Sequence, residues 1–155
     1  MNKEFKNFEV NLYYIKSDFN SIALRLCKKL TEKRVLIKLN DDQEMNSLDK
    51  FLWTKEKDGF LPHKTFLEKL YDKDKLVLFY GDSLQSIDIE KYEIMLVSPN
   101  VQIKKLAFLK KFFLFSNSSF DKKIYESICS KLKNKVNTLK CFCEYDVFKW
   151  KLVSN

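Results

Sequence analysis

Two runs in this chain, Lys75–Tyr80 and Tyr92–Val97, are apolar at nearly every position. A strand with one solvated face alternates apolar and polar residues, whereas a strand covered on both faces reads as a continuous apolar run. Strands of the second kind occur mainly in parallel sheets, because the crossover helices of a parallel sheet pack on both of its faces. These two runs therefore predict an α/β protein with a mostly parallel central sheet.

Segments with helical periodicity lie between the predicted strands. Phe8–Tyr14 and Arg34–Lys38 read as strands, and between them apolar residues recur at helical spacing from Phe19 to Leu30. A helix is expected there, capped by Asp18, Asn20 or Ser21.

A second helix is expected after Asp41, which stands three residues before Glu44 in the spacing of a capping pair. Its apolar face is formed by Met45, Leu48 and Leu52.

The carboxyl-terminal part continues the same alternation. Ile103, Leu106 and Ala107 indicate a short helix, and Phe112–Phe115 a fifth strand. A last amphipathic helix is predicted from apolar residues at every fourth position, namely Phe120, Ile124, Ile128 and Leu132. The tail Leu139–Leu152 is aromatic and only partly alternating, which leaves a terminal strand open. The whole pattern predicts one domain over residues 1–155, a three-layer sandwich that is Rossmann-like but without the Gly-rich nucleotide loop.

Glycine usage argues against phosphate binding. The chain has two glycines, Gly59 and Gly81, and the connection from residue 15 to residue 21 contains neither. Dinucleotide-binding turns and Walker loops need glycine so that backbone amides can approach the phosphates. No nucleotide or other cofactor is expected.

Catalytic and metal-binding motifs are also missing from the sequence. The single histidine, His63, follows Pro62 in a predicted loop, where a ring hydrogen-bonded to backbone is the expected role. Cys141 and Cys143 lack the two-residue spacer of zinc hairpins, so reduced, structural cysteines and no metal are expected. The chain reads as a binding protein rather than an enzyme.

The net charge of +8 is concentrated in one segment. Residues 101–140 hold ten lysines against Asp121 and Glu126, which accounts for the whole excess. Such a one-sided basic segment favours an acidic partner, either nucleic acid or an acidic peptide, although lysines can also simply solvate one side of a fold. No secretory leader or membrane-length apolar run is evident, so a cytoplasmic protein is expected.

The segment from Arg34 to His63 combines several distinctive features. A strand (RVLI) is followed by an acidic turn, by the pattern Leu48-Asp49-x-x-Leu52-Trp53, and then by Phe60-Leu61-Pro62-His63. This layout resembles the chi subunit of bacterial DNA polymerase III. The element order of the remaining chain is also similar to that family. The resemblance implies a non-enzymatic accessory subunit that links the clamp loader to single-stranded DNA-binding protein.

The resemblance also implies two binding surfaces. The first would dock the psi subunit, or an equivalent clamp-loader or helicase partner, through Trp53, Phe60, Leu61, Pro62 and His63. Aromatic side chains at a helix end are suited to such anchoring, but the same rings could instead fasten the loop to the core.

The second implied surface would take the acidic carboxyl-terminal tail of single-stranded DNA-binding protein. The matching positions are Phe115, as an apolar wall, and Lys122, Lys123 and Lys131. The family's Arg-Glu-Arg sequence is absent here, and lysine lacks the two-pronged geometry with which arginine binds carboxylates. Contact with nucleic acid would then be mainly indirect, and no membrane is involved.

Two other interpretations remain. The basic segment could bind single-stranded nucleic acid directly, with Phe108, Phe112 and Phe115 as stacking platforms. Alternatively, a degenerate α/β enzyme could use His63 and a nearby thiol.

Overall fold

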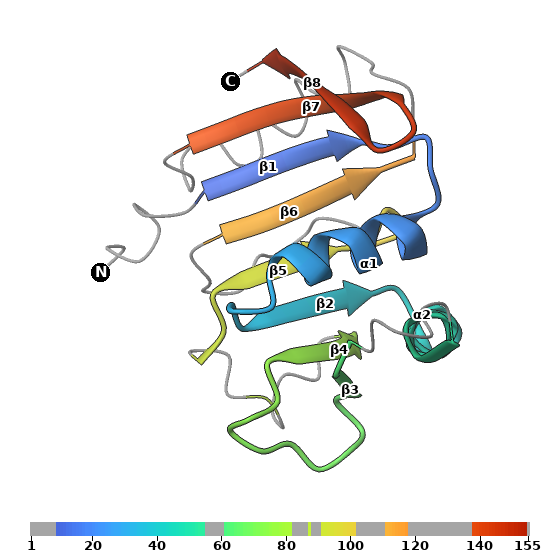
Figure 1. Ribbon diagram of the computed structural model, residues 1–155, viewed down its shortest axis with the longest axis vertical. Helices are drawn as coiled ribbons and strands as arrows, with labels where there is room; N and C mark the ends of the chain where they lie inside the picture. Colours follow the sequence, from blue (N-terminus) through green and yellow to red (C-terminus); the bar gives the residue numbers. More distant parts are fainter. Residues whose placement is uncertain are drawn as a thin grey trace.

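In its described part, the protein forms an eight-stranded sheet with helices packed on it (Figure 1). The computed structural model describes residues 9–54, 61–81, 87, 91–101, 111–117 and 138–154. The described elements, in chain order, are β1 (Glu9–Tyr14), α1 (Phe19–Lys29), β2 (Val35–Leu39), α2 (Asp42–Thr54), β3 (Lys64–Thr65), β4 (Leu76–Tyr80), β5 (Ile94–Val97), β6 (Lys111–Ser116), β7 (Thr138–Asp146) and β8 (Lys149–Ser154).

The sheet is mostly parallel, as the continuous apolar runs predicted. Its strand order is β3-β4-β2-β5-β6-β1-β7-β8, and among the described strands only the pairing of β7 with β8 is antiparallel. β4 and β5 flank β2 in the centre, and every residue of β5 is buried. The predicted α/β class is confirmed.

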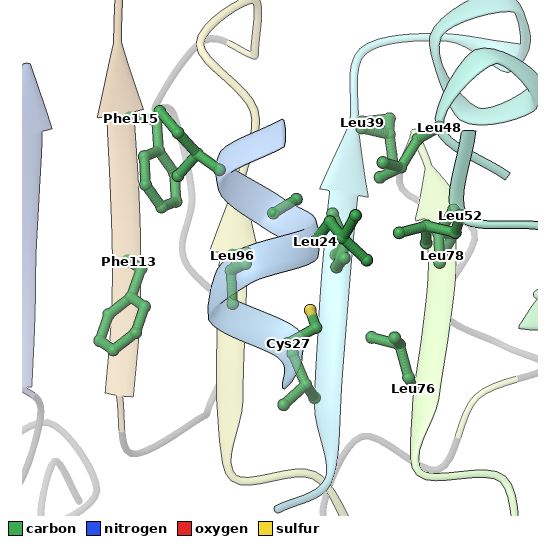
Figure 2. Close-up of a cluster of buried hydrophobic side chains, with 14 of the residues drawn as sticks. Leu24, Cys27, Leu39, Leu48, Leu52, Leu76, Leu78, Leu96, Phe113 and Phe115 are labelled. Carbon is green, nitrogen blue, oxygen red and sulfur yellow. The ribbon is translucent and has the colours of Figure 1, made fainter. Parts of the chain in front are cut away.

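Successive residues of β2 point to opposite faces of the sheet and enter two separate cores. Val35, Ile37 and Leu39 belong to one apolar cluster, and Leu36 belongs to the other. Helices α1 and α2 cover the first cluster, in which Leu24 and Cys27 of α1 lie over the sheet (Figure 2). The helices predicted near residues 103–107 and 120–132 lie outside the described residues.

Both described helices begin at the caps that the sequence indicated. The Asp18 carboxylate accepts the Ser21 amide at 3.0 Å and so caps α1. The Asp41 carboxylate accepts the Glu44 amide at 2.9 Å, while the Glu44 side chain returns to the Asn40 amide at 2.7 Å. This reciprocal bonding satisfies amides that a helix start leaves without partners.

The sequence did not decide whether the carboxyl-terminal tail forms a terminal strand, and the structure shows more than one strand there. The tail forms two strands, β7 and β8, joined by a tight turn in which Phe148 adopts a left-handed conformation with φ of 57°. The turn contains no glycine, so the usual sequence signal of a hairpin is missing. The guanidinium of Arg25 lies 4.2 Å from the Phe148 ring centre, a cation–π contact that helps to hold this residue.

Glu144 connects the hairpin to the segment between β1 and α1. Its buried carboxylate accepts the Lys16 and Ser17 amides at 2.6 and 2.8 Å, the Ser17 hydroxyl at 2.6 Å and the Phe148 amide at 2.8 Å. Burial raises the pKa of this carboxyl, but hydrogen bonds from the Ser17 side chain and from the three amides lower it more, so its pKa lies below the usual value.

We expect Glu144→Gln to lower the free energy of unfolding by about 2–4 kcal/mol, because an amide nitrogen would face donors that now bind an anion. Since the folded pKa is depressed, the contribution of Glu144 is present above its unfolded pKa of roughly 4.3 and is lost as the pH falls through the folded value. Urea unfolding between neutral and acidic pH measures both effects.

The matched control is Glu9→Gln, which removes an exposed carboxylate whose ion pair with Lys111 has a separation of 3.9 Å. An equal loss of stability in the two variants would contradict the role given to Glu144.

Candidate partner-docking surface

Trp53 lies at the end of α2 and is half exposed. The buried face of this helix (Met45, Leu48 and Leu52) packs into the core, which fixes the helix on the sheet. Trp53 lies next to the end of this packed face, and 52% of its surface is accessible. The structure therefore presents a large aromatic side chain on a rigid support.

The ring of His63 packs against the ring of Trp53. The His63 side chain is fully buried, and the centres of the two rings are 5.0 Å apart. Its Nδ1 lies 2.8 Å from the Leu61 carbonyl oxygen, and its Nε2 lies 2.8 Å from the Asp49 carboxylate. The predicted hydrogen bond from His63 to backbone is confirmed.

Asp49 is a part of this arrangement that sequence analysis missed. Its carboxylate and the Leu61 carbonyl oxygen lie on the two ring nitrogens of His63, so contacts at both nitrogens fix the orientation of the ring. Asp49 and Trp53 are four residues apart on α2 and therefore lie on one face of the helix. That spacing, together with a histidine shortly after the helix, is the signal that could have indicated the contact.

The loop before β3 divides into buried and exposed positions. Leu61 is buried in the first apolar cluster, and His63 is buried as described, whereas Pro62 is exposed. Of the five positions predicted for this surface, Trp53 and Pro62 are accessible, and Leu61 and His63 hold them in place. Phe60 lies outside the described residues.

A small cavity of about 220 Å³ opens beside this loop. Its walls come from α1, β2 and β4 and from the Leu61–His63 loop, and the lining residues are Cys27, Leu30, Thr31, Lys33, Val35, Leu61, Pro62, His63, Lys73, Asp74, Lys75 and Leu76. Cys27 faces the sheet from the last turn of α1, and Leu76 lies at the start of β4 (Figure 2).

His63 and Cys27 line the same cavity, but they do not form a reactive pair. Burial raises the pKa of the Cys27 thiol to about 12, which keeps it protonated and weakly nucleophilic. Both nitrogens of His63 already have partners. The interpretation as an enzyme using this histidine and thiol therefore has no support in the geometry.

A second crevice, of about 710 Å³, lies at the carboxyl ends of the parallel strands, where related architectures bind nucleotides. Asp18 and Asp41 cap the two helices that border it, and Glu144 takes the amides of Lys16 and Ser17. The backbone donors that would hold a phosphate thus already bind carboxylates, which would also repel an anion.

A comparison with models of protein families identifies the family of this chain. The family model of the DNA polymerase III chi subunit (HolC) matches residues 9–117, well over half of the chain. The chain belongs to the chi subunit family. A comparison with curated proteins found no match.

Chi subunits are non-catalytic accessory subunits that associate with components of the DNA polymerase III holoenzyme. The family match contains the segment 34–63 that carried the resemblance, and it ends one residue after β6. In the described parts of the chain, no helix is long and apolar enough to cross a membrane.

The predicted acidic-tail site of this chi-family chain is only partly described. Lys122, Lys123 and Lys131 lie outside the described residues. Phe115 is 5% exposed and packs 5.2 Å from the ring centres of both Tyr13 and Phe19. Phe115 therefore packs in the core, which leaves little of its surface for the apolar wall that the resemblance implied.

Two of the aromatic side chains predicted to stack on the bases of nucleic acid are also buried. Phe112 is fully buried and Phe115 nearly so, because they occupy the two faces of a strand inside the sheet. Phe108 lies outside the described residues. Two of the three proposed rings are thus inaccessible to bases.

We expect His63→Ala to lower the free energy of unfolding by about 2–4 kcal/mol, since it removes one buried and one partly buried hydrogen bond and leaves a cavity. Trp53→Ala should cost about 1 kcal/mol, because half of that side chain is already solvated. Urea unfolding followed by circular dichroism measures both values. A cost for Trp53→Ala as large as that for His63→Ala would show that the Trp53 ring belongs to the core.

Proposed function

We propose that this chi-family protein is an adaptor in the cytoplasmic replication machinery, with Trp53 as the anchor for one partner. The partner is the psi subunit or an equivalent clamp-loader or helicase protein. The observation that carries the proposal is the half-exposed Trp53 ring, held against a buried His63 at the end of a well-packed helix.

The energetics of such a surface favour binding. An indole that is already oriented loses little conformational entropy when a partner covers it, and aromatic anchors of this kind dominate many interfaces. His63 limits the motion of the ring through its bonds to Leu61 and Asp49. Phe60, next to Leu61 in the sequence, is proposed to extend the same apolar surface.

We expect Trp53→Ala to weaken binding of the purified psi subunit, or of the equivalent partner, by about 30-fold or more, as loss of a hot-spot residue does. Isothermal titration calorimetry with the full chain measures the dissociation constant. The matched control is Tyr145→Ala, which removes another exposed aromatic side chain. Tyr145 lies in β7, near the other edge of the sheet from β3. Unchanged affinity in Trp53→Ala would reject Trp53 as the anchor.

The second proposed activity is binding of the acidic tail of single-stranded DNA-binding protein through Lys122, Lys123 and Lys131. The concentration of positive charge in residues 101–140 supports this proposal. Because lysine–carboxylate contacts at a surface are screened by salt, we expect the affinity for an acidic peptide ending in phenylalanine to fall as the ionic strength rises. Fluorescence anisotropy at low and high salt measures this change.

Replacing these three lysines together by serine should remove most of the salt-dependent binding. A control with the same loss of charge is the triple serine variant of Lys29, Lys50 and Lys69, which are all exposed and lie outside the basic segment 101–140 of the sequence. Affinity that is the same at both salt concentrations, or is reduced equally by the two triple variants, would reject this site. Single-stranded DNA in the same assay distinguishes tail binding from direct binding of nucleic acid.

A further inference from the structure

The cavity beside the Leu61–His63 loop has an apolar interior and a positively charged rim. Four buried apolar residues, Cys27, Val35, Leu61 and Leu76, form the interior walls together with the buried ring of His63. The exposed residues at the opening are Thr31, Lys33, Pro62, Lys73 and Lys75. An apolar group inside the cavity and an anionic group at its mouth would each find a complementary surface.

Among the described residues that line the cavity, the one carboxylate is that of Asp74, and it already has an ion-pair partner and a hydrogen-bond donor. Asp74 pairs with Lys64 at 3.0 Å and accepts the Tyr71 amide at 2.7 Å. Lys33 lies 3.4 Å from Glu93, but both side chains are about half exposed, so this pair contributes little. Lys33, Lys73 and Lys75 therefore leave the rim with a net positive charge.

The size of the cavity limits what can enter it. Pockets for cofactors and drug-sized ligands measure roughly 300–1,000 Å³, and this cavity of about 220 Å³ is smaller. It is large enough for one leucine or phenylalanine side chain. The cavity is also close to the docking surface. Pro62 and His63 line the cavity, and His63 also contacts Trp53.

We propose that the cavity receives one apolar side chain from an acidic segment of the partner that docks on Trp53. Carboxylates next to that side chain meet Lys33, Lys73 and Lys75. The proposal rests on the proposed partner-docking function and adds the chemistry of the bound segment: a polypeptide with an apolar residue flanked by aspartate or glutamate, which passes over Pro62.

The first test uses a short synthetic peptide with one leucine flanked by aspartates. Amide chemical shifts of the full-length protein are recorded while the peptide is added. The largest shifts should occur at Leu30, Val35 and Leu76. A peptide with serine in place of leucine, or lysines in place of the aspartates, should cause no such shifts. Shifts at other places, or equal shifts with all three peptides, would overturn the proposal.

The second test reverses the charge of the rim. Lys73→Glu with Lys75→Glu changes two exposed side chains and should weaken peptide binding about tenfold, because attraction to the peptide carboxylates becomes repulsion. The matched control is Lys149→Glu with Lys151→Glu, which makes the same change in net charge on β8, at the other edge of the sheet from β4, and should alter affinity less than about twofold. Equal weakening in the two double variants would contradict a defined site.

The same variants separate this proposal from the one on which it rests. If Trp53→Ala weakens the protein partner but the rim reversal does not, Trp53 remains the anchor and the cavity is rejected as part of the site. If the peptide shifts the cavity residues while Trp53→Ala leaves partner binding unchanged, the cavity remains a site and Trp53 is rejected. Loss of partner binding in both variants, together with the peptide shifts, supports both proposals.

Discussion

A parallel sheet must be covered on both faces, and the docking surface follows from that requirement. The apolar face of α2 packs on β2, β3 and β4 because these strands present buried side chains toward it. The helix therefore ends at a fixed position, and its last turn leaves Trp53 at the surface. The loop that returns to β3 crosses that end, so His63 reaches Asp49 and lies against the indole. Core packing thus places an accessible aromatic ring without a dedicated binding element.

At the carboxyl edge of the same sheet, side chains of the protein itself occupy the positions that hold phosphate in nucleotide-binding α/β proteins. Helix starts at the carboxyl edge of a parallel sheet offer amides and a favourable dipole for anions. In the described part of this protein, the starts of both helices are occupied by carboxylates from the chain itself, Asp18 on α1 and Asp41 on α2. The positive ends of the helices are used for stability, which agrees with the non-catalytic role of the chi subunit family.

Features set by local sequence were predicted well, and features set by distant contacts were not. The caps at Asp18 and Asp41 depend on three-residue spacings, and the buried strands depend on composition, so each could be read directly. The bond between Asp49 and His63 requires the chain to return onto α2. Phe115 was expected in a pocket wall although its own apolar run already indicated a buried strand. The β7–β8 hairpin was missed because its turn uses Phe148 where a glycine would be expected.

Glu144 lies in β7, beyond the last residue matched to the family, yet it binds the β1–α1 connection inside the matched part. β7 also supplies the parallel neighbour on one edge of β1. A polypeptide ending at residue 117 would lose both the carboxylate and that neighbouring strand. The loop amides would then lack their acceptor, and β1 would become an open edge able to pair with other chains. The boundary of family similarity is therefore not a boundary of cooperative folding.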